Sequence, residues 1–267
     1  MGKLTRRELV VGSVAALTAP VLGVTANVQS AQKHICLVHG AWHGAWAWKL
    51  LTPLLIRSEY SVSMLDLSGL GANTHRQAAD VGLHVHGKDV LNHLFYNDFH
   101  DVTVVAHSYG GAVLSEALAN DADQRISHAV YLDAFLLHEG ESVAGTQGPE
   151  AKKSFEDAAA NGAMIPPRAR DTWERMWGLT GDDAEWSAPR MSEMSARCFT
   201  ESVQGDTFKN DIRRTYMRCI QNKNPLFDRF SAFARNDDRF DQLDVDGHHN
   251  VMVIDPPTML QAILKVV

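Results

Sequence analysis

The chain has 267 residues, of which 45% are apolar and 21% charged, and its formal net charge is −7. This length and composition favour one large globular domain, and the absence of a long basic run argues against a nucleic-acid partner. The three cysteines, Cys36, Cys198 and Cys219, are odd in number and lack metal-ligand spacing, so they predict neither a disulfide framework nor a metal site. Cys36 and Cys219 lie in apolar runs and are expected to be buried free thiols.

The N-terminal segment differs in composition from the rest of the chain. Arg6 and Arg7 precede a short apolar run, rich in small residues, from Val11 to Ala19. Small residues ending at Ala26 offer a cleavage site, with Ala31 as a later one. A basic segment, a short apolar run and a cleavage site predict a secretory signal, and the paired arginines resemble a bacterial twin-arginine signal.

We therefore expect residues 1–31 to be a signal peptide and linker, and residues 32–267 to be the mature domain. The alternatives are an uncleaved membrane anchor and an ordinary N-terminal helix. The apolar run is too short for a good spanning helix, so no stable membrane insertion is expected after cleavage. The predicted location is periplasmic or secreted; the sequence leaves the oligomeric state open.

Apolar runs alternate with amphipathic segments through the first half of the chain. The strand predicted at 34–38 ends in the segment His39-Gly40-Ala41-Trp42, where the glycine permits a tight turn. The further elements predicted here are a helix at 46–57, a strand at 60–65, a helix at 81–96, a strand at 102–105, a helix at 112–119 and a strand at 126–132. This alternation predicts a mostly parallel sheet with helices on both faces.

Ser108 stands at the tip of a strand-to-helix turn. The motif Ala106-His107-Ser108-Tyr109-Gly110 follows β-branched residues and precedes an alanine-rich helical pattern. This context is typical of the nucleophile elbow of α/β-hydrolases, in which small residues let the helix pack closely on the strand. In that fold the loop after the first predicted strand and the residue after the nucleophile supply oxyanion donors, here the backbone N–H groups of Ala41 and Tyr109. Helix capping is the simpler role open to Ser108.

The alternation breaks after the strand that ends at Asp133. The segment 136–208 is polar and irregular, with helical patterns at 151–160 and 167–177, and a long insertion of this kind is typical of a cap. Its aromatic residues, Trp173 and Trp177 among them, are predicted to line a substrate pocket or to pack the cap onto the core. The remaining predicted elements are a strand at 212–220, a helix at 225–235, a strand at 240–245 and a C-terminal helix from residue 257.

A serine nucleophile requires a histidine base and an acid that orients it, in the chain order serine, acid, histidine. Two histidines, His248 and His249, follow the last predicted strand. The sequence offers two candidates for the acid. Asp133 ends a core strand on the expected edge of the sheet, where it is open to the simpler role of capping the loop, and Asp228 lies in the following helix.

Four motifs together resemble one family. These are His39 to Trp46, His107 to Gly111, Tyr131 to Phe135 and the C-terminal His-x-Val-Met segment. They are similar to motifs of the small α/β-hydrolases related to plant salicylate-type methylesterases and hydroxynitrile lyases, and in particular to the bacterial esterases among them.

The resemblance implies an α/β-hydrolase fold with a cap inserted after Asp133. In the family, the catalytic histidine stands three residues before a methionine and seven before a proline. Met252 and Pro256 then select His249 over His248. Plant relatives carry the acid three residues past a cysteine, but counting from Cys219 gives Asn222, which is not a carboxylate. Asp133 is therefore preferred as the acid, with Asp228 or a dyad held by Asn222 as the alternatives.

The sequence predicts a serine hydrolase that cleaves a small, mostly apolar carboxylic ester, or a related carbamate or amide, through an acyl-enzyme on Ser108. His39, Gly40, Trp42, His107, Trp173 and Trp177 are predicted to contact the substrate. No metal or organic cofactor is expected.

A hydroxynitrile-lyase activity and a non-catalytic binding function on the same fold are the alternatives. Family lyases carry a threonine at the position of Gly40 and a lysine at that of Asn250.

Overall fold

The computed structural model describes residues 32–267, and the predicted signal at 1–31 lies outside them. The core is a six-stranded sheet in the order β2-β1-β3-β4-β7-β8, in which every neighbouring pair is parallel. The strands are β1 (His34–Val38), β2 (Ser61–Leu65), β3 (Val102–His107), β4 (Ile126–Leu132), β7 (Arg213–Cys219) and β8 (Asp241–Val245). The predicted α/β-hydrolase fold with a parallel sheet is confirmed.

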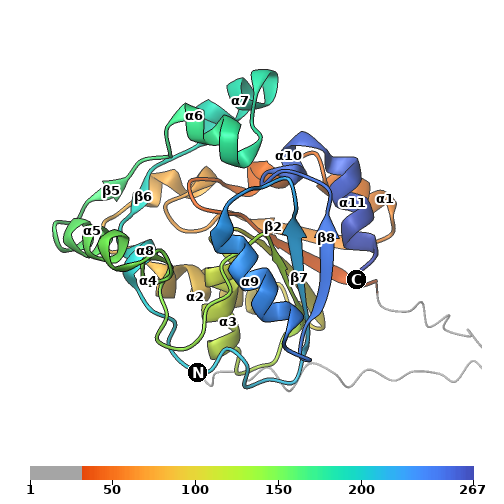
Figure 1. The fold of residues 1–267 in the computed structure, drawn as a ribbon. Helices are drawn as coiled ribbons and strands as arrows, with labels where there is room; N and C mark the ends of the chain where they lie inside the picture. The colour runs from red at the N-terminus through yellow and green to blue at the C-terminus, as the bar shows by residue number, and fades with distance from the viewer. Residues whose placement is uncertain (1–31) are drawn as a thin grey trace, which may run out of the picture. The chain divides into compact units, whose positions relative to one another are not determined.

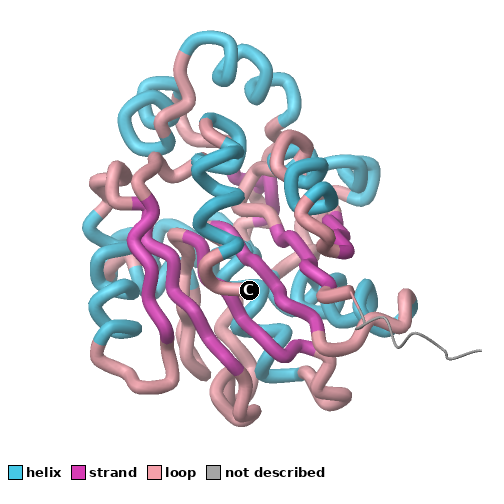
Figure 2. Tube along the Cα trace, turned by 90° about the vertical axis from the view of Figure 1, so that its right-hand side faces the viewer, coloured by secondary structure: helices cyan, strands magenta, loops and turns pink. Residues whose placement is uncertain are grey.

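Helices cover both faces of this sheet (Figures 1 and 2). α1 (Thr52–Arg57) packs on α11 (Pro256–Leu264) on one face, and α2 (Leu83–Tyr96) packs on α3 (Gly110–Asn120) on the other. The central strands are consequently buried on both sides, which is why β1 and β3 read as continuous apolar runs rather than alternating ones. Cys36, Cys198 and Cys219 are buried free thiols, as expected for the first and third.

One predicted helix is wrong in its extent. The segment expected as a single helix at 46–57 consists of a 3-10 turn (Ala45–Trp48) followed by α1. Pro53 lies in the first turn of α1, where its missing N–H is tolerated, whereas a continuous helix would need that N–H in its interior. Apolar spacing alone did not reveal this break.

The segment predicted as a cap lies between β4 and β7 and carries its own small elements. They are α4 (Val143–Thr146), α5 (Pro149–Ala160), β5 (Met164–Ile165), α6 (Arg170–Thr172), a π-helical turn (Trp173–Trp177), α7 (Gly181–Ser187), a 3-10 turn (Ala188–Arg190), β6 (Met194–Ser195) and α8 (Arg197–Thr200). β5 and β6 form an antiparallel pair. α6 and α7 stand beyond the ends to which the strand arrows point (Figure 1).

The last part of the chain completes the sheet. α9 (Pro225–Arg235) packs against β7 and β8, and α10 (Val251–Ile254) precedes α11. A further 3-10 helix (Gly71–Arg76) follows β2. None of the helices in the described part of the chain is both long and apolar enough to cross a membrane.

Two glycines allow α3 to approach the strand ends closely. A Cβ atom on Gly110 would lie 2.7 Å from the backbone oxygen of His39, and one on Gly111 would lie 2.4 Å from that of Phe135. Both distances are shorter than van der Waals contact, and backbone atoms cannot move aside as a flexible side chain can. The glycines after Ser108 therefore hold the start of α3 against its neighbours.

We expect the substitution Gly111→Ala to lower the free energy of unfolding by about 1–3 kcal/mol, because overpacking forces the backbone to shift. Gly145→Ala is the control, since its Cβ would meet only the Ser142 hydroxyl, at 3.2 Å. Urea unfolding followed by circular dichroism gives both values. Equal stabilities for the two variants would contradict this account of the turn.

Candidate active site

The carboxyl ends of three strands bring the predicted catalytic residues together. Ser108 directly follows β3, Asp133 directly follows β4, and His249 lies in the loop after β8. Parallel strands end at the same edge of a sheet, so residues far apart in the sequence meet there.

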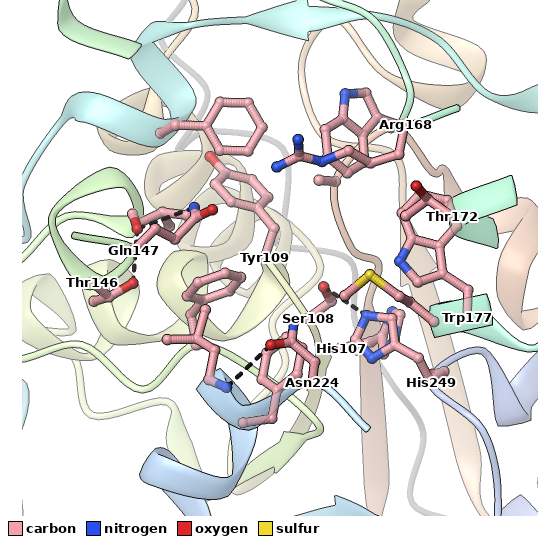
Figure 3. A pocket seen from close by; sticks show the side chains of 18 of the residues that line it. His107, Ser108, Tyr109, Thr146, Gln147, Arg168, Thr172, Trp177, Asn224 and His249 are labelled. Carbon is pink, nitrogen blue, oxygen red and sulfur yellow. Dashed lines mark hydrogen bonds between the residues drawn. The ribbon is translucent and has the colours of Figure 1, made fainter. Parts of the chain in front are cut away.

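The three side chains form a hydrogen-bonded row. The Ser108 Oγ lies 3.0 Å from Nε2 of His249, and Nδ1 of the same ring lies 2.6 Å from Oδ2 of Asp133. A carboxylate only accepts hydrogen bonds, so Nδ1 carries the proton and Nε2 is left to accept the proton of the serine hydroxyl. Figure 3 shows Ser108 and His249 side by side at the cavity. The competing His248 packs its ring against Gly178 instead.

Two residues of this row have left-handed backbone conformations. φ is 53° at Ser108 and 44° at Asp133, a region that residues other than glycine rarely adopt. Neighbouring strand ends impose both conformations. The N–H of Ser108 donates to Leu132 O, the N–H of Phe135 donates to Ser108 O, and the N–H of Asp133 donates to Met217 O at 2.7 Å. Strain of this kind persists where the surrounding structure fixes it, often at functional sites.

The Asp133 carboxylate is fully buried and accepts four hydrogen bonds. Oδ1 accepts from the Arg218 guanidinium at 2.7 Å and from the backbone N–H of Cys219 at 3.3 Å. Oδ2 accepts from His249 and, at 2.6 Å, from Nδ2 of Asn222. A buried carboxylate is tolerated when it is paired and its lone pairs are satisfied, and both conditions hold here.

The two alternatives to Asp133 support it instead. Asp228 accepts hydrogen bonds from Arg218 at 2.8 and 2.9 Å, and its side chain is 65% exposed. Asn222 donates to Asp133, and its Oδ1 accepts from the N–H of Asn224 at 3.1 Å, which fixes the orientation of the amide. The structure thus places a carboxylate beside His249, although Asn222 occupies the position where plant relatives carry the acid.

The two predicted oxyanion donors face the same cavity as Ser108. Ala41 and Tyr109 both line it, and neither backbone N–H donates a hydrogen bond within residues 32–267. The side chain of His43 fixes the loop that carries Ala41. Its Nδ1 donates to Ala41 O at 2.6 Å, and its Nε2 accepts from Asn250 Nδ2 at 2.9 Å. Trp42 has a φ of 63°, which turns the chain sharply at this point.

Several buried histidines around the row are neutral. Burial lowers the pKa of His39 to about 3 and that of His43 to about 4, and it lowers the pKa of His107 well below its ordinary value. Nε2 of His107 donates to the backbone oxygen of His249 at 2.9 Å, so this ring holds the loop that carries the predicted base. These histidines position backbone groups without adding charge next to His249.

A cavity of about 660 Å³ opens at Ser108, and some of the residues predicted to contact the substrate line it. Trp42, His107 and Trp177 line it. Three other predicted contacts do not. His39 is fully buried and accepts from Leu67 N–H, Gly40 lies behind His107 and Ser108, and Trp173 stacks on Trp177 at 6.1 Å. These three residues share one reason: a motif places a residue near a site, but packing decides whether the residue faces the cavity.

Sequence reasoning missed several polar residues of the cavity. Thr146, Gln147 and Arg168 come from the cap, and Asn224 and Arg229 come from the segment around the start of α9. Nothing in the sequence marked them, because the path of the cap decides which of its residues reach the site. Among residues 32–267, no three His, Cys, Asp or Glu side chains are arranged to hold a metal ion.

Comparison with known proteins identifies the family of the chain. A family model described as "Alpha/beta hydrolase family" matches residues 37–261. The chain belongs to the alpha/beta hydrolase family. Its site therefore occupies the edge of the sheet at which this family's nucleophile elbow is found.

The relatives of this alpha/beta hydrolase include proteins named as esterases. A carbendazim hydrolyzing esterase of Nocardioides sp. (strain SG-4G) is 36% identical over 107 residues, 40% of this chain and 44% of that protein. Methylesterase 2 of Arabidopsis thaliana is 39% identical over 108 residues, 39% of this chain and 40% of that protein. A pheophorbidase of Raphanus sativus is 28% identical over 150 residues, 56% of this chain and 51% of that protein. The matches span about half of these relatives or less. The predicted resemblance to methylesterases is confirmed.

Solved structures extend the likeness over the whole fold. An extracellular alpha/beta-hydrolase from a Paenibacillus species superimposes with a TM-score of 0.73 at 22% identity, covering 88% of this chain and 98% of that one. An Arabidopsis methylesterase superimposes with a TM-score of 0.66 at 24% identity, covering 87% and 98%. At these identities the likeness shows a shared fold.

We expect Arg218→Met to lower the free energy of unfolding by about 3–5 kcal/mol, because it leaves the buried Asp133 charge without its cation. Asp228→Asn removes an exposed partner of the same arginine and should cost less than about 1 kcal/mol. Denaturant unfolding of both variants checks the difference. Similar losses would mean that the buried pair adds little to stability.

Stability should fall as the pH drops from about 6.5 towards 4. In that range the unfolded chain takes up protons on His39 and His43, whereas the folded chain, with their pKa values lowered to about 3 and about 4, does not. Each such histidine contributes up to about 1.4 kcal/mol per pH unit. Unfolding measured across this range should show a shallower slope for His43→Gln. An unchanged slope would show that His43 is not held neutral by the fold.

Proposed function

We propose that this alpha/beta hydrolase is a serine esterase that cleaves small carboxylic esters through an acyl-enzyme on Ser108. The observation that carries the proposal is the row Ser108–His249–Asp133, which opens on a cavity beside two backbone N–H groups that donate to no acceptor in the described part of the chain. The relatives named as esterases and methylesterases support ester hydrolysis as the reaction class.

The geometry suits a two-step acyl transfer. Ser108 Oγ attacks the ester carbonyl carbon while His249 Nε2 takes the hydroxyl proton, and the developing negative charge falls on the carbonyl oxygen. The N–H groups of Ala41 and Tyr109 stabilise that oxygen, and Asp133 stabilises the imidazolium. His249 then protonates the departing alcohol. A water molecule, deprotonated by His249, releases the acid and regenerates the serine.

Aromatic side chains make up much of the cavity wall and favour a mostly apolar acyl or alcohol group. Trp42 stacks with Trp177 at 5.8 Å, and Phe135, Phe199 and Phe227 line the other parts of the cavity. A volume of about 660 Å³ is typical of sites for small organic molecules. A related carbamate or amide would satisfy the same geometry.

The lyase alternative fits this site less well. A Cβ on Gly40 would lie 3.0 Å from both His107 Nδ1 and Ser108 Cβ, which leaves little room for the threonine of family lyases. Asn250, at the position of the lyase lysine, is buried and bonded to His43. A purely binding function leaves unexplained why Ser108 and His249 are aligned for proton transfer. We also propose export from a bacterial cell, on the composition of residues 1–31 alone.

We expect Ser108→Ala and His249→Ala to abolish hydrolysis of a short-chain p-nitrophenyl ester above background, and Asp133→Asn to lower kcat by roughly 10³–10⁴-fold. Asn222→Ala removes only one of the four hydrogen bonds on Asp133 and should cost about tenfold or less. Stopped-flow release of p-nitrophenolate measures the acylation burst and the turnover of each variant.

His248→Ala is the matched control for the base, because this neighbour packs on Gly178 rather than on Ser108. Full turnover in Ser108→Ala would refute the serine mechanism. A nearly silent Asp133→Asn, with Ser108→Ala inactive, would refute only the role of the acid.

A further inference from the structure

The charge of the cavity wall is opposite to the charge of the chain. The protein carries a formal net charge of −7, yet the residues that line the cavity above Ser108 include two arginines, Arg168 and Arg229, and no aspartate or glutamate. A cleft lined by one sign of charge concentrates ligands of the other sign. This arrangement was not expected from the sequence, which indicated a mostly apolar pocket.

Arg168 lies in the cap, between β5 and α6. Its guanidinium carbon stands 5.8 Å from the ring centre of Trp42, which itself lines the cavity. In Figure 3 the guanidinium points into the cavity from the side on which Thr172 and Trp177 enter, opposite Thr146 and Gln147.

The guanidinium of Arg168 has no carboxylate partner within the described residues, whereas two other arginines of the cap do. Arg170 pairs with Glu185 at 2.7 Å, and Arg197 pairs with Glu201 at 2.6 Å. An arginine that faces a cavity without a carboxylate keeps its planar set of donors available for a ligand.

Two polar side chains across the cavity already donate to the backbone of the cap. The Thr146 hydroxyl donates to Val143 O at 2.7 Å, and the Gln147 amide donates to the same oxygen at 3.3 Å. Both are thereby engaged with the backbone of α4. Among the side chains that line the cavity, the guanidinium groups are the donors best suited to an anionic group.

We propose that Arg168 binds a carboxylate carried by the substrate in addition to its scissile ester. The substrate class is then the half-ester of a dicarboxylic acid, with an apolar spacer against the aromatic wall and its free carboxylate on the guanidinium. Arginine binds carboxylates through two parallel N–H···O bonds, which fix orientation as well as charge. This inference rests on the esterase activity proposed above and specifies its substrate.

The test uses the half-methyl esters of straight-chain dicarboxylic acids from succinate to suberate. Each is compared with the neutral ester in which the free carboxylate is replaced by a primary amide of the same shape. In the wild type, kcat/KM for the best-fitting half-ester should exceed that of its amide by about tenfold, mainly through KM. The preference should shrink in high salt, because the guanidinium is exposed.

Arg168→Gln should remove this preference, so that the ratio of kcat/KM between the half-ester and its amide-bearing counterpart falls from about tenfold to about one. Arg175→Gln is the matched control: it removes the same charge from an exposed residue of the π-helical turn that does not line the cavity, and it should keep the preference. A preference that survives in Arg168→Gln but is lost in Arg229→Gln would overturn the assignment to Arg168.

Failure of this inference differs from failure of the proposed function. If the enzyme cleaves p-nitrophenyl acetate and the neutral, amide-bearing methyl esters but shows no preference for the half-esters, the carboxylate subsite alone is overturned. The absence of hydrolysis with every ester, p-nitrophenyl acetate included, would overturn the esterase proposal and the subsite with it.

Discussion

The buried carboxylate of Asp133 is the interaction on which the arrangement of the site depends. A charge with no exposure to solvent is stable only when it is fully paired, so its surroundings are constrained on every side. Arg218 and Cys219 come from β7, Asn222 from the loop that follows it, and His249 from the loop after β8. One carboxylate therefore ties together the ends of three neighbouring strands. Its hydrogen bond to Nδ1 of His249 sets the position of the imidazole.

Backbone hydrogen bonds between neighbouring strand ends impose the left-handed conformation at two residues of the site. Asp133 and Ser108 directly follow adjacent parallel strands, and both have a positive φ. The backbone bonds that hold them link the ends of β3, β4 and β7, so the sheet fixes the spacing between acid and serine before any ligand binds. Such preorganisation is what the proposed acyl transfer requires, since small displacements of reacting groups lower rates strongly.

Much of the fold and the serine–histidine pair could be predicted because these features are local in sequence. Ser108 was marked by the strand-turn-helix pattern around it, and His249 by its spacing to Met252 and Pro256. The orientation of Gly40, His39 and Trp173 could not be predicted, because packing between distant segments decides which side of a residue faces a cavity. Arg218 gave no signal either: as a cation in a strand it reads as an edge residue until its buried partner is known.

β4 and β7 are hydrogen-bonded neighbours, and the whole cap lies between them. Because the two strands are parallel, the chain leaves β4 at the carboxyl edge of the sheet and, after the cap, returns to the opposite edge to begin β7. The loop-closure entropy of such a connection grows only slowly with its length. Arg168 and Trp177 belong to this insertion, whereas Ser108, Asp133 and His249 do not. Evolution can therefore lengthen, shorten or rewrite the part of the chain that selects the ligand without disturbing the part that performs the proposed chemistry. A laboratory exchange of caps between relatives would exploit the same modularity.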